Sequence, residues 1–276
     1  MGTSVSIFPA TGVIPMFFMR LLLLLVGLCL WQLENHGRAD DLCQAETPDK
    51  PHIVMLVAER EYETMQSLRN FAGDQEKFYR TTIVVEDPND RNRLIGLDSL
   101  QTADLLLVSV RRRTLPKEQL DLIRRFISRG KPVIGIRTAS HAFSLRNKKP
   151  PEGRADWKNF DQTVFGGNYT NHHGNDLQVE IGFADAELNH TIVTGIDAML
   201  RYSSTSSLYR VSPLMPGTKV LLRGQVEGHP AEPIAWTFKR ADGGKSFYTS
   251  LGNTEDFEGK VLPVLLANAI AWGLSK

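Results

Sequence analysis

A polar segment follows directly after a short apolar run in the middle of the chain. Residues 133–136 read as a buried strand, and Arg137 and Thr138 come immediately after it, with His141 four residues beyond the arginine. Ligands bind at the carboxyl ends of parallel strands in open α/β sheets, so side chains placed there often act on a ligand. A guanidinium offers its N–H donors in a planar fork, which suits a carboxylate, a phosphate or vicinal hydroxyls. We therefore predict that Arg137, Thr138 and His141 lie in a ligand-binding cleft.

These residues also have structural alternatives. Arg137 could pair with Glu59 or Glu255 inside the protein and do no more than fix the turn. His141 could be an ordinary structural histidine. Glu59 follows the first apolar run, residues 52–57, and so belongs to the same predicted edge of the sheet. We place it among the ligand-binding candidates.

A long loop-rich segment, residues 146–176, carries a second group of candidates. Loops of this length inside a compact domain are usually functional or disordered. Tyr169 could stack on the C–H face of a sugar or pack against the sheet. His172 and His173 cannot both point the same way in an extended segment. Their spacing to acidic residues matches no known metal motif, so we predict that one of them contacts the ligand and that the chain holds no metal or other cofactor.

Apolar runs and amphipathic stretches alternate along the chain and must position these side chains. Uniformly apolar runs predict strands that are covered on both faces, and the pattern of residues 116–130 predicts a helix with one apolar face. Strands are expected at 52–57, 80–85, 103–110, 133–136, 177–181, 219–223, 233–238 and 246–251, and helices at 63–78, 116–130 and 261–272. This alternation predicts an α/β fold with a parallel sheet and helices on both faces.

Several short blocks occur in an order that resembles one protein family. They are residues 135–139, 165–167 with 172–173, 189–192, 207–209, 233–236, 247–253 and 268–272. Together they are similar to the trehalose-utilisation (ThuA-like) family, within the class I glutamine amidotransferase-like superfamily. The resemblance covers nearly all of residues 51–274, and we assign a single domain to residues 51–276. It implies a flavodoxin-like three-layer sandwich with a mostly parallel sheet.

The resemblance also implies what has become of the superfamily's catalytic triad. By that resemblance, Arg137 stands at the position of the nucleophilic cysteine, Asn253 at that of the histidine and Glu255 at that of the glutamate. A guanidinium has no lone pair with which to attack, and an amide cannot take up a proton as an imidazole does. We therefore expect no glutaminase activity, assign Glu255 as the remaining candidate proton carrier, and count Asn253 among the ligand-binding residues. ThuA-like proteins often have histidine at both of the substituted positions, so this chain departs from their pattern too.

The bulk composition is that of an ordinary globular protein. The chain has 276 residues, 42% hydrophobic content and a formal net charge of +1. Its arginine clusters are balanced by acids, which argues against a nucleic-acid partner. The expected partner is a sugar-like small molecule, and nothing in the sequence favours a particular oligomeric state. A non-catalytic scaffold or interaction module is the alternative function.

The first forty residues have the pattern of an export signal. Arg20 precedes the apolar run 21–31, and Gly37 and Ala39 supply the small residues of a cleavage site. We predict a signal peptide over residues 1–39, a flexible leader over 40–50, and a periplasmic or extracellular protein. The alternative is an uncleaved N-terminal anchor, which is the only membrane association expected. Only two cysteines are present, so no disulfide framework or cysteine metal site is expected.

Overall fold

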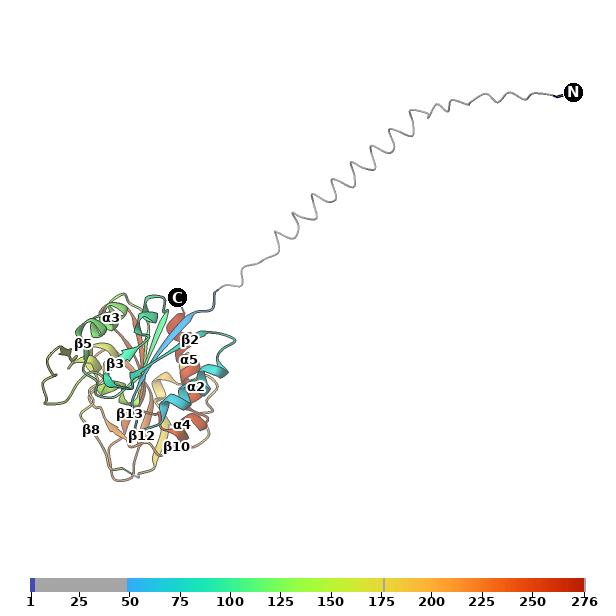
Figure 1. Ribbon diagram of the computed structural model, residues 1–276. Coiled ribbons are helices and arrows are strands. Elements are labelled where there is room, and N and C mark those ends of the chain that lie inside the picture. Colours follow the sequence, from blue (N-terminus) through green and yellow to red (C-terminus); the bar gives the residue numbers. More distant parts are fainter. Residues whose placement is uncertain (3–48, 176, 276) are drawn as a thin grey trace. The chain divides into compact units, whose positions relative to one another are not determined.

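A ten-stranded sheet forms the centre of the fold in this computed structural model (Figure 1). The structure describes residues 1–2, 49–175 and 177–275. The predicted cleavage site, the apolar run before it and the leader up to residue 48 lie outside the described residues. The strands are ordered β10-β9-β12-β13-β14-β6-β4-β1-β2-β3. Their bounds are β1 His52–Ala58, β2 Arg80–Asp87, β3 Asp90–Ile95, β4 Leu105–Val110, β6 Val133–Ile136, β9 Val179–Phe183, β10 Tyr202–Ser204, β12 Thr218–Gln225, β13 Glu232–Lys239 and β14 Lys245–Thr249.

The middle of the sheet is parallel. Strands β2, β1, β4, β6 and β14 run in the same direction, with Ile53 opposite Leu105 and Leu107 opposite Ile134. Every residue of β1, β4 and β6 is buried, as uniformly apolar strands covered on both faces require. The predicted α/β flavodoxin-like fold is therefore confirmed.

Helices cover both faces of this parallel centre. The described helices are α2 Thr64–Asp74, α3 Lys117–Ser128, α4 Thr254–Glu258 and α5 Leu262–Leu274. Helices α2 and α5 bury Leu68 and Leu265 in one core with Met55 of β1. Helix α3 buries Leu120 and Ile123 in a second core on the opposite face, and Figure 1 shows it on the other side of the sheet from α5. Among the described residues no helix combines the length and apolarity that crossing a membrane requires.

The sheet also has an antiparallel part that the apolar runs alone did not predict. Strand β13 pairs antiparallel with β14 and β12, β9 pairs antiparallel with β12 and β10, and β3 returns antiparallel beside β2 at the other edge. Strand β3 is half exposed and begins with four polar residues, and β10 has only three residues, so their sequences carry little apolar signal.

Short elements occupy the connections. The predicted loop 146–176 contains a one-turn π-helix, η3 Asp161–Phe165. The remaining short pieces are β5 Leu115–Pro116, β7 Arg154–Ala155, β8 Asn171–His172, β11 Tyr209–Arg210 and the 3-10 turns η1 Leu97–Gln101, η2 Arg137–His141, η4 Asp185–Glu187 and η5 Thr191–Val193. Strands β8 and β11 pair, which joins the loop to the segment that leads into β12.

Candidate functional site

The backbone turns sharply at Arg137, directly after β6. Its φ angle is 44°, in the left-handed region that side chains other than glycine rarely adopt. The hydroxyl of Tyr248 donates a 2.6 Å hydrogen bond to the Arg137 carbonyl, and the turn packs closely against Gly252, where a Cβ would meet Ile136 at 2.6 Å. Neighbouring strand ends thus hold the turn in a strained conformation.

The side chain of Arg137 is buried inside the protein. Its Nη1 donates to the carbonyl oxygen of Ser250 at 2.9 Å, and Nη2 donates to Oγ of Ser207 at 3.0 Å. The guanidinium also lies against two rings, 4.2 Å from the centroid of Tyr62 and 4.8 Å from that of Tyr209. Only 2% of the residue is exposed, and among the described residues no carboxylate pairs with it. The alternative in which Arg137 pairs with Glu59 or Glu255 is therefore not what holds this arginine, and the side chain also lies outside the solvent-exposed cleft in which we predicted it.

The side chain of Glu59 forms hydrogen bonds with the residues at the start of α2. Its carboxylate accepts the backbone N–H groups of Glu61 at 2.8 Å, Tyr62 at 3.0 Å and Thr64 at 3.0 Å, together with the Thr64 hydroxyl. These bonds fix the turn that carries Tyr62 over the arginine. Thr138, next to Arg137, is buried as well, at 1% exposure.

A polar cleft of about 600 Å³ lies at the same carboxyl edge of the sheet. Its walls come from the residues after β4 and β6 and from the segment around η3. It is lined by Arg112, Ser140, His141, Ser144, Arg146, Asn147, Lys158, Asn159, Asp161, Gln162, Asn168, Tyr169, Thr170 and Asn171. Of the candidates from the sequence, His141 and Tyr169 line this cleft.

Stacked aromatic rings connect this cleft to the buried arginine. The Tyr169 ring stacks on the His141 ring with centroids 4.5 Å apart and an interplanar angle of 25°. Tyr209 lies behind them, 4.6 Å from Tyr169, and its ring also contacts Arg137. We call Tyr169, Tyr209 and Tyr62 the tyrosine layer. Arg137 therefore lies beneath the cleft wall and not on its surface.

His141 is a neutral histidine. Burial is the main cause that holds its pKa well below the usual value, and the nearby Arg112, Arg111, Arg146 and Arg137 lower that pKa further. Its Nδ1 lies 3.1 Å from the hydroxyl of Ser140. An uncharged imidazole in this position can exchange hydrogen bonds with hydroxyl groups.

Cations line the cleft next to His141, and the backbone N–H of Arg112 donates to the His141 carbonyl at 3.1 Å. Arg112 and Arg146 have φ angles of 50° and 58°, so each stands on a left-handed backbone. Arg112 is half-buried and its Nη1 donates only a long bond of 3.3 Å, to the carbonyl of Ser144. Burial first, and then the charge of Arg146, lower the pKa of Arg112. Lys158 adds an exposed ammonium.

Asp161 is a buried carboxyl on the cleft wall that the sequence reasoning missed. Its Oδ2 accepts the backbone N–H of Tyr169 at 2.8 Å, whereas Oδ1 has no hydrogen-bond partner among the described residues. Burial raises its pKa to about 7, although the Tyr169 N–H opposes the shift. A Cβ on Gly167 would overlap this carboxylate. The signal available in the sequence was one acidic residue beside Phe160 and shortly before two glycines.

The paired histidines lie away from this cleft. His172 turns its Nδ1 to the carbonyl of His173, 2.6 Å away. The Nε2 of His173 lies 3.9 Å from Glu232 Oε1, and its ring is 4.5 Å from that of His229. Within the described part of the chain, no group of three or more histidine, cysteine, aspartate or glutamate side chains is arranged to hold a metal ion.

Asn253 and Glu255 lie at the start of α4. Asn253 caps this helix, since its side chain accepts the N–H of Asp256 at 2.9 Å and donates to Thr205 Oγ1 at 2.7 Å. Glu255 is exposed in the first turn. Asp256 is the buried acid here, and its Oδ2 accepts the Gly252 N–H and the Ser206 hydroxyl, both at 2.7 Å. The structure thus brings neither Asn253 nor Glu255 into the polar cleft.

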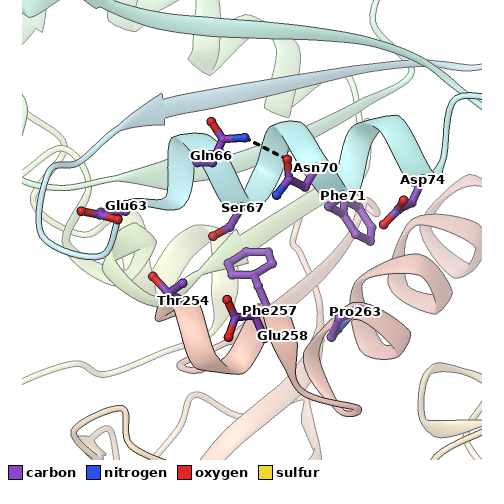
Figure 2. A pocket seen from close by; sticks show the side chains of 10 residues that line it. All are labelled: Glu63, Gln66, Ser67, Asn70, Phe71, Asp74, Thr254, Phe257, Glu258 and Pro263. Carbon is purple, nitrogen blue, oxygen red and sulfur yellow. Dashed lines mark hydrogen bonds between the residues drawn. The ribbon is translucent and has the colours of Figure 1, made fainter.

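A second, smaller pocket of about 210 Å³ lies between α2 and the α4–α5 segment (Figure 2). Phe71 and Phe257 face each other across it, and Glu63, Asp74 and Glu258 supply carboxylates. None of the candidate residues from the sequence lines this pocket.

The sheet and the polar cleft at its carboxyl edge define an α/β protein of the flavodoxin-like kind. A family model described as "ThuA: Trehalose utilisation" matches residues 52–273, and the chain belongs to the ThuA family. This confirms the resemblance noted in the sequence. No curated protein matches the chain.

Solved structures with a similar fold have little sequence in common with it. A ThuA-like protein from Bacteroides uniformis is 16% identical, with a TM-score of 0.62 over 84% of this chain and 94% of that one. A ThuA-like protein from Parabacteroides merdae is 14% identical, with a TM-score of 0.58 over 82% and 91%. The mmIFT52 N-terminal domain is 12% identical, with a TM-score of 0.52 over 82% and 98%. These likenesses concern the fold alone.

Proposed function

We propose that this ThuA-family protein binds a carbohydrate or sugar derivative in the cleft beside His141. The observation that carries the proposal is the Tyr169–His141 stack on the wall of a cleft that is otherwise lined by polar side chains. A sugar presents hydroxyl groups around its ring edge and C–H groups on its faces. Asparagine, glutamine and serine side chains can satisfy the hydroxyl groups, and an aromatic ring can cover a face.

The volume of the cleft agrees with this ligand class. At about 600 Å³ it falls within the range of small-molecule sites. The neutral imidazole of His141 can donate to or accept from a hydroxyl group without placing a charge against it. We propose no glutaminase chemistry, because Arg137 offers no lone pair and its guanidinium is occupied by Ser250 and Ser207.

The test is a thermal-shift and calorimetry screen of residues 40–276 against mono- and disaccharides and their charged derivatives. Stabilisation by a sugar that is lost in Tyr169→Ala and kept in Tyr202→Ala supports the proposal. Tyr202, on the edge strand β10, is the matched control because it lies outside the cleft. Binding that survives Tyr169→Ala unchanged would place the ligand elsewhere.

A non-catalytic scaffold is the second candidate, and one observation favours it. Two of the three residues at the expected triad positions, Arg137 and Asn253, are used in internal contacts. Absence of any sugar binding, together with capture of a protein partner whose binding depends on exposed surface residues, would favour the scaffold.

We also propose that the protein is exported through a signal peptide over residues 1–39. The apolar run 21–31 after Arg20 and the small residues Gly37 and Ala39 support this. N-terminal sequencing of protein recovered outside the cytoplasm should begin at Asp40. Recovery of the uncut chain in the membrane fraction would instead identify an anchor.

A further inference from the structure

The charge on the wall of the polar cleft is strongly one-sided. Arg112, Arg146 and Lys158 line it, and Asp161 is the one carboxylate among the described lining residues. None of the three cations takes part in an ion pair within the described residues. Free surface cations usually point into solvent, but these converge on a concave site, where their fields add.

Asp161 does not neutralise this charge through an ion pair. Its Oδ2 is used by the Tyr169 N–H, and its Oδ1 is buried without a hydrogen-bond partner in the described structure. An ionised carboxylate in such a position loses its hydration and gains one hydrogen bond in return. Burial therefore favours the protonated, uncharged form of the carboxyl group and raises its pKa.

The groups around Asp161 come from every element packed on η3. Tyr248 approaches from β14, and Trp236 from β13 donates to the Phe165 carbonyl at 2.7 Å. Burial keeps the phenol of Tyr248 protonated, because it raises the pKa well above the usual value. His141, at the end of η2, is neutral because burial lowers its pKa well below the usual value. Burial raises the pKa of Asp161 to about 7, so this carboxyl group on the cleft wall changes charge near neutral pH.

We propose that the ligand of this cleft is an anionic sugar derivative, with a carboxylate or phosphate held by Arg112 and Arg146, and that it binds while Asp161 is uncharged. This inference rests on the proposed sugar-binding function and names its ligand class. Arginine suits both anions, since its fork can bind two oxygens at once. An ionised Asp161 would repel the ligand from the same wall.

A pH dependence of binding follows from this arrangement. Glucuronate keeps its charge between pH 6 and pH 8, whereas Asp161 ionises there. If the ligand binds only the protonated form, its affinity falls by up to about tenfold over these two units. In Asp161→Asn the side chain stays uncharged, and the affinity should change less than about twofold.

The experiment is calorimetry at pH 6 with glucose, glucuronate, glucose 6-phosphate, acetate and inorganic phosphate as probes. We expect one or both charged sugars to bind more tightly than glucose and than the simple anions, and the stronger of the two identifies the anionic group. Arg112→Gln should weaken that binding about tenfold. Arg129→Gln, at the opposite edge of the sheet after α3, should leave it unchanged.

The outcomes separate this inference from the function it rests on. Glucose binding as tightly as the charged sugars would overturn the anionic ligand class and leave the sugar-binding function standing. Acetate or phosphate binding as tightly as the charged sugars would overturn the sugar-binding function and leave an anion site. No binding by any probe would overturn both.

The role of Asp161 has its own measurement. Wild-type affinity for glucuronate that is flat between pH 6 and pH 8, or a pH dependence that persists in Asp161→Asn, would overturn it. If that variant does not fold, the wild-type carboxyl carbon can be followed by NMR. Bound glucuronate should raise the Asp161 pKa, and an unchanged titration would contradict the proposal.

Discussion

The Tyr209 ring lies between the buried arginine and the cleft wall, 4.8 Å from the Arg137 guanidinium carbon. The ring of Tyr169, which lines the cleft, has its centroid 4.6 Å from that of Tyr209. A charge that is never exposed to solvent is thus in contact with the layer on which the proposed ligand would lie. Arg137 can therefore fix the positions of Tyr209 and Tyr169 without contacting a ligand in the cleft.

Replacing Arg137 by alanine should destabilise the protein by about 3 kcal/mol. The change leaves the Ser250 carbonyl and the Ser207 hydroxyl without their donor and opens a void between two rings. Arg137→Met fills that void without the cost of burying a charge, and should lose less stability. Urea unfolding of both variants measures the difference, and an equal loss in the two would mean that the charge itself matters most.

Gly167→Ala should destabilise the protein by about 2 kcal/mol, because the new methyl group would overlap the Asp161 carboxylate. Gly73→Ala is the matched control, since nothing lies within 4 Å of its Cβ position and the residue is inside α2. That change should stabilise the protein by about 0.5–1 kcal/mol, through helix propensity. Thermal unfolding of the two single variants tests the contrast.

Asp161 should make the protein less stable as the pH rises from 4 to 7. Its folded pKa, about 7, lies above the usual aspartate value of 3.8, so the folded state holds a proton that the unfolded state has released. Stability therefore falls with pH across this window, by an amount on the order of 4 kcal/mol from this group alone. Urea unfolding of Asp161→Asn should show a correspondingly flatter profile. A wild-type profile of the same slope as the variant would refute the raised pKa.

Asp256→Ala should cost about 2–3 kcal/mol, whereas Glu255→Ala should cost less than about 0.5 kcal/mol. The Asp256 carboxylate satisfies the Gly252 N–H and the Ser206 hydroxyl in a buried position. Glu255 is exposed one residue earlier. Denaturation curves of the two variants compare adjacent acids in the same helix, and similar losses would contradict the assignment.

The parallel part of the fold could be predicted from the sequence because its strands are covered on both faces. The largely apolar run 105–110 predicts a buried strand, and the apolar face of α3 predicts a helix packed on the sheet. The antiparallel strand β3 is polar and half exposed, and β10 has only three residues, so their patterns resemble those of loops.

The site was harder to predict, since its contacts join distant segments. The position of Arg137 at a strand end followed from the local pattern, but its partner Ser250 is 113 residues away. Asp161 was missed because its burial depends on Gly167 and on the packing of η3 against β14 and β13, neither of which has a local signature.

Around the cleft, Arg112, Arg137 and Arg146 all have positive φ angles, of 50°, 44° and 58°. Glycine would adopt that backbone without strain. Each arginine therefore makes the local backbone conformation higher in energy than it would be with glycine at the same position. Arg112→Gly or Arg146→Gly would relax the backbone and remove a cation from the cleft at the same time. A directed-evolution experiment that selects for heat resistance alone should therefore favour glycine at positions 112 and 146, and each of these changes would remove a cation from the proposed ligand cleft.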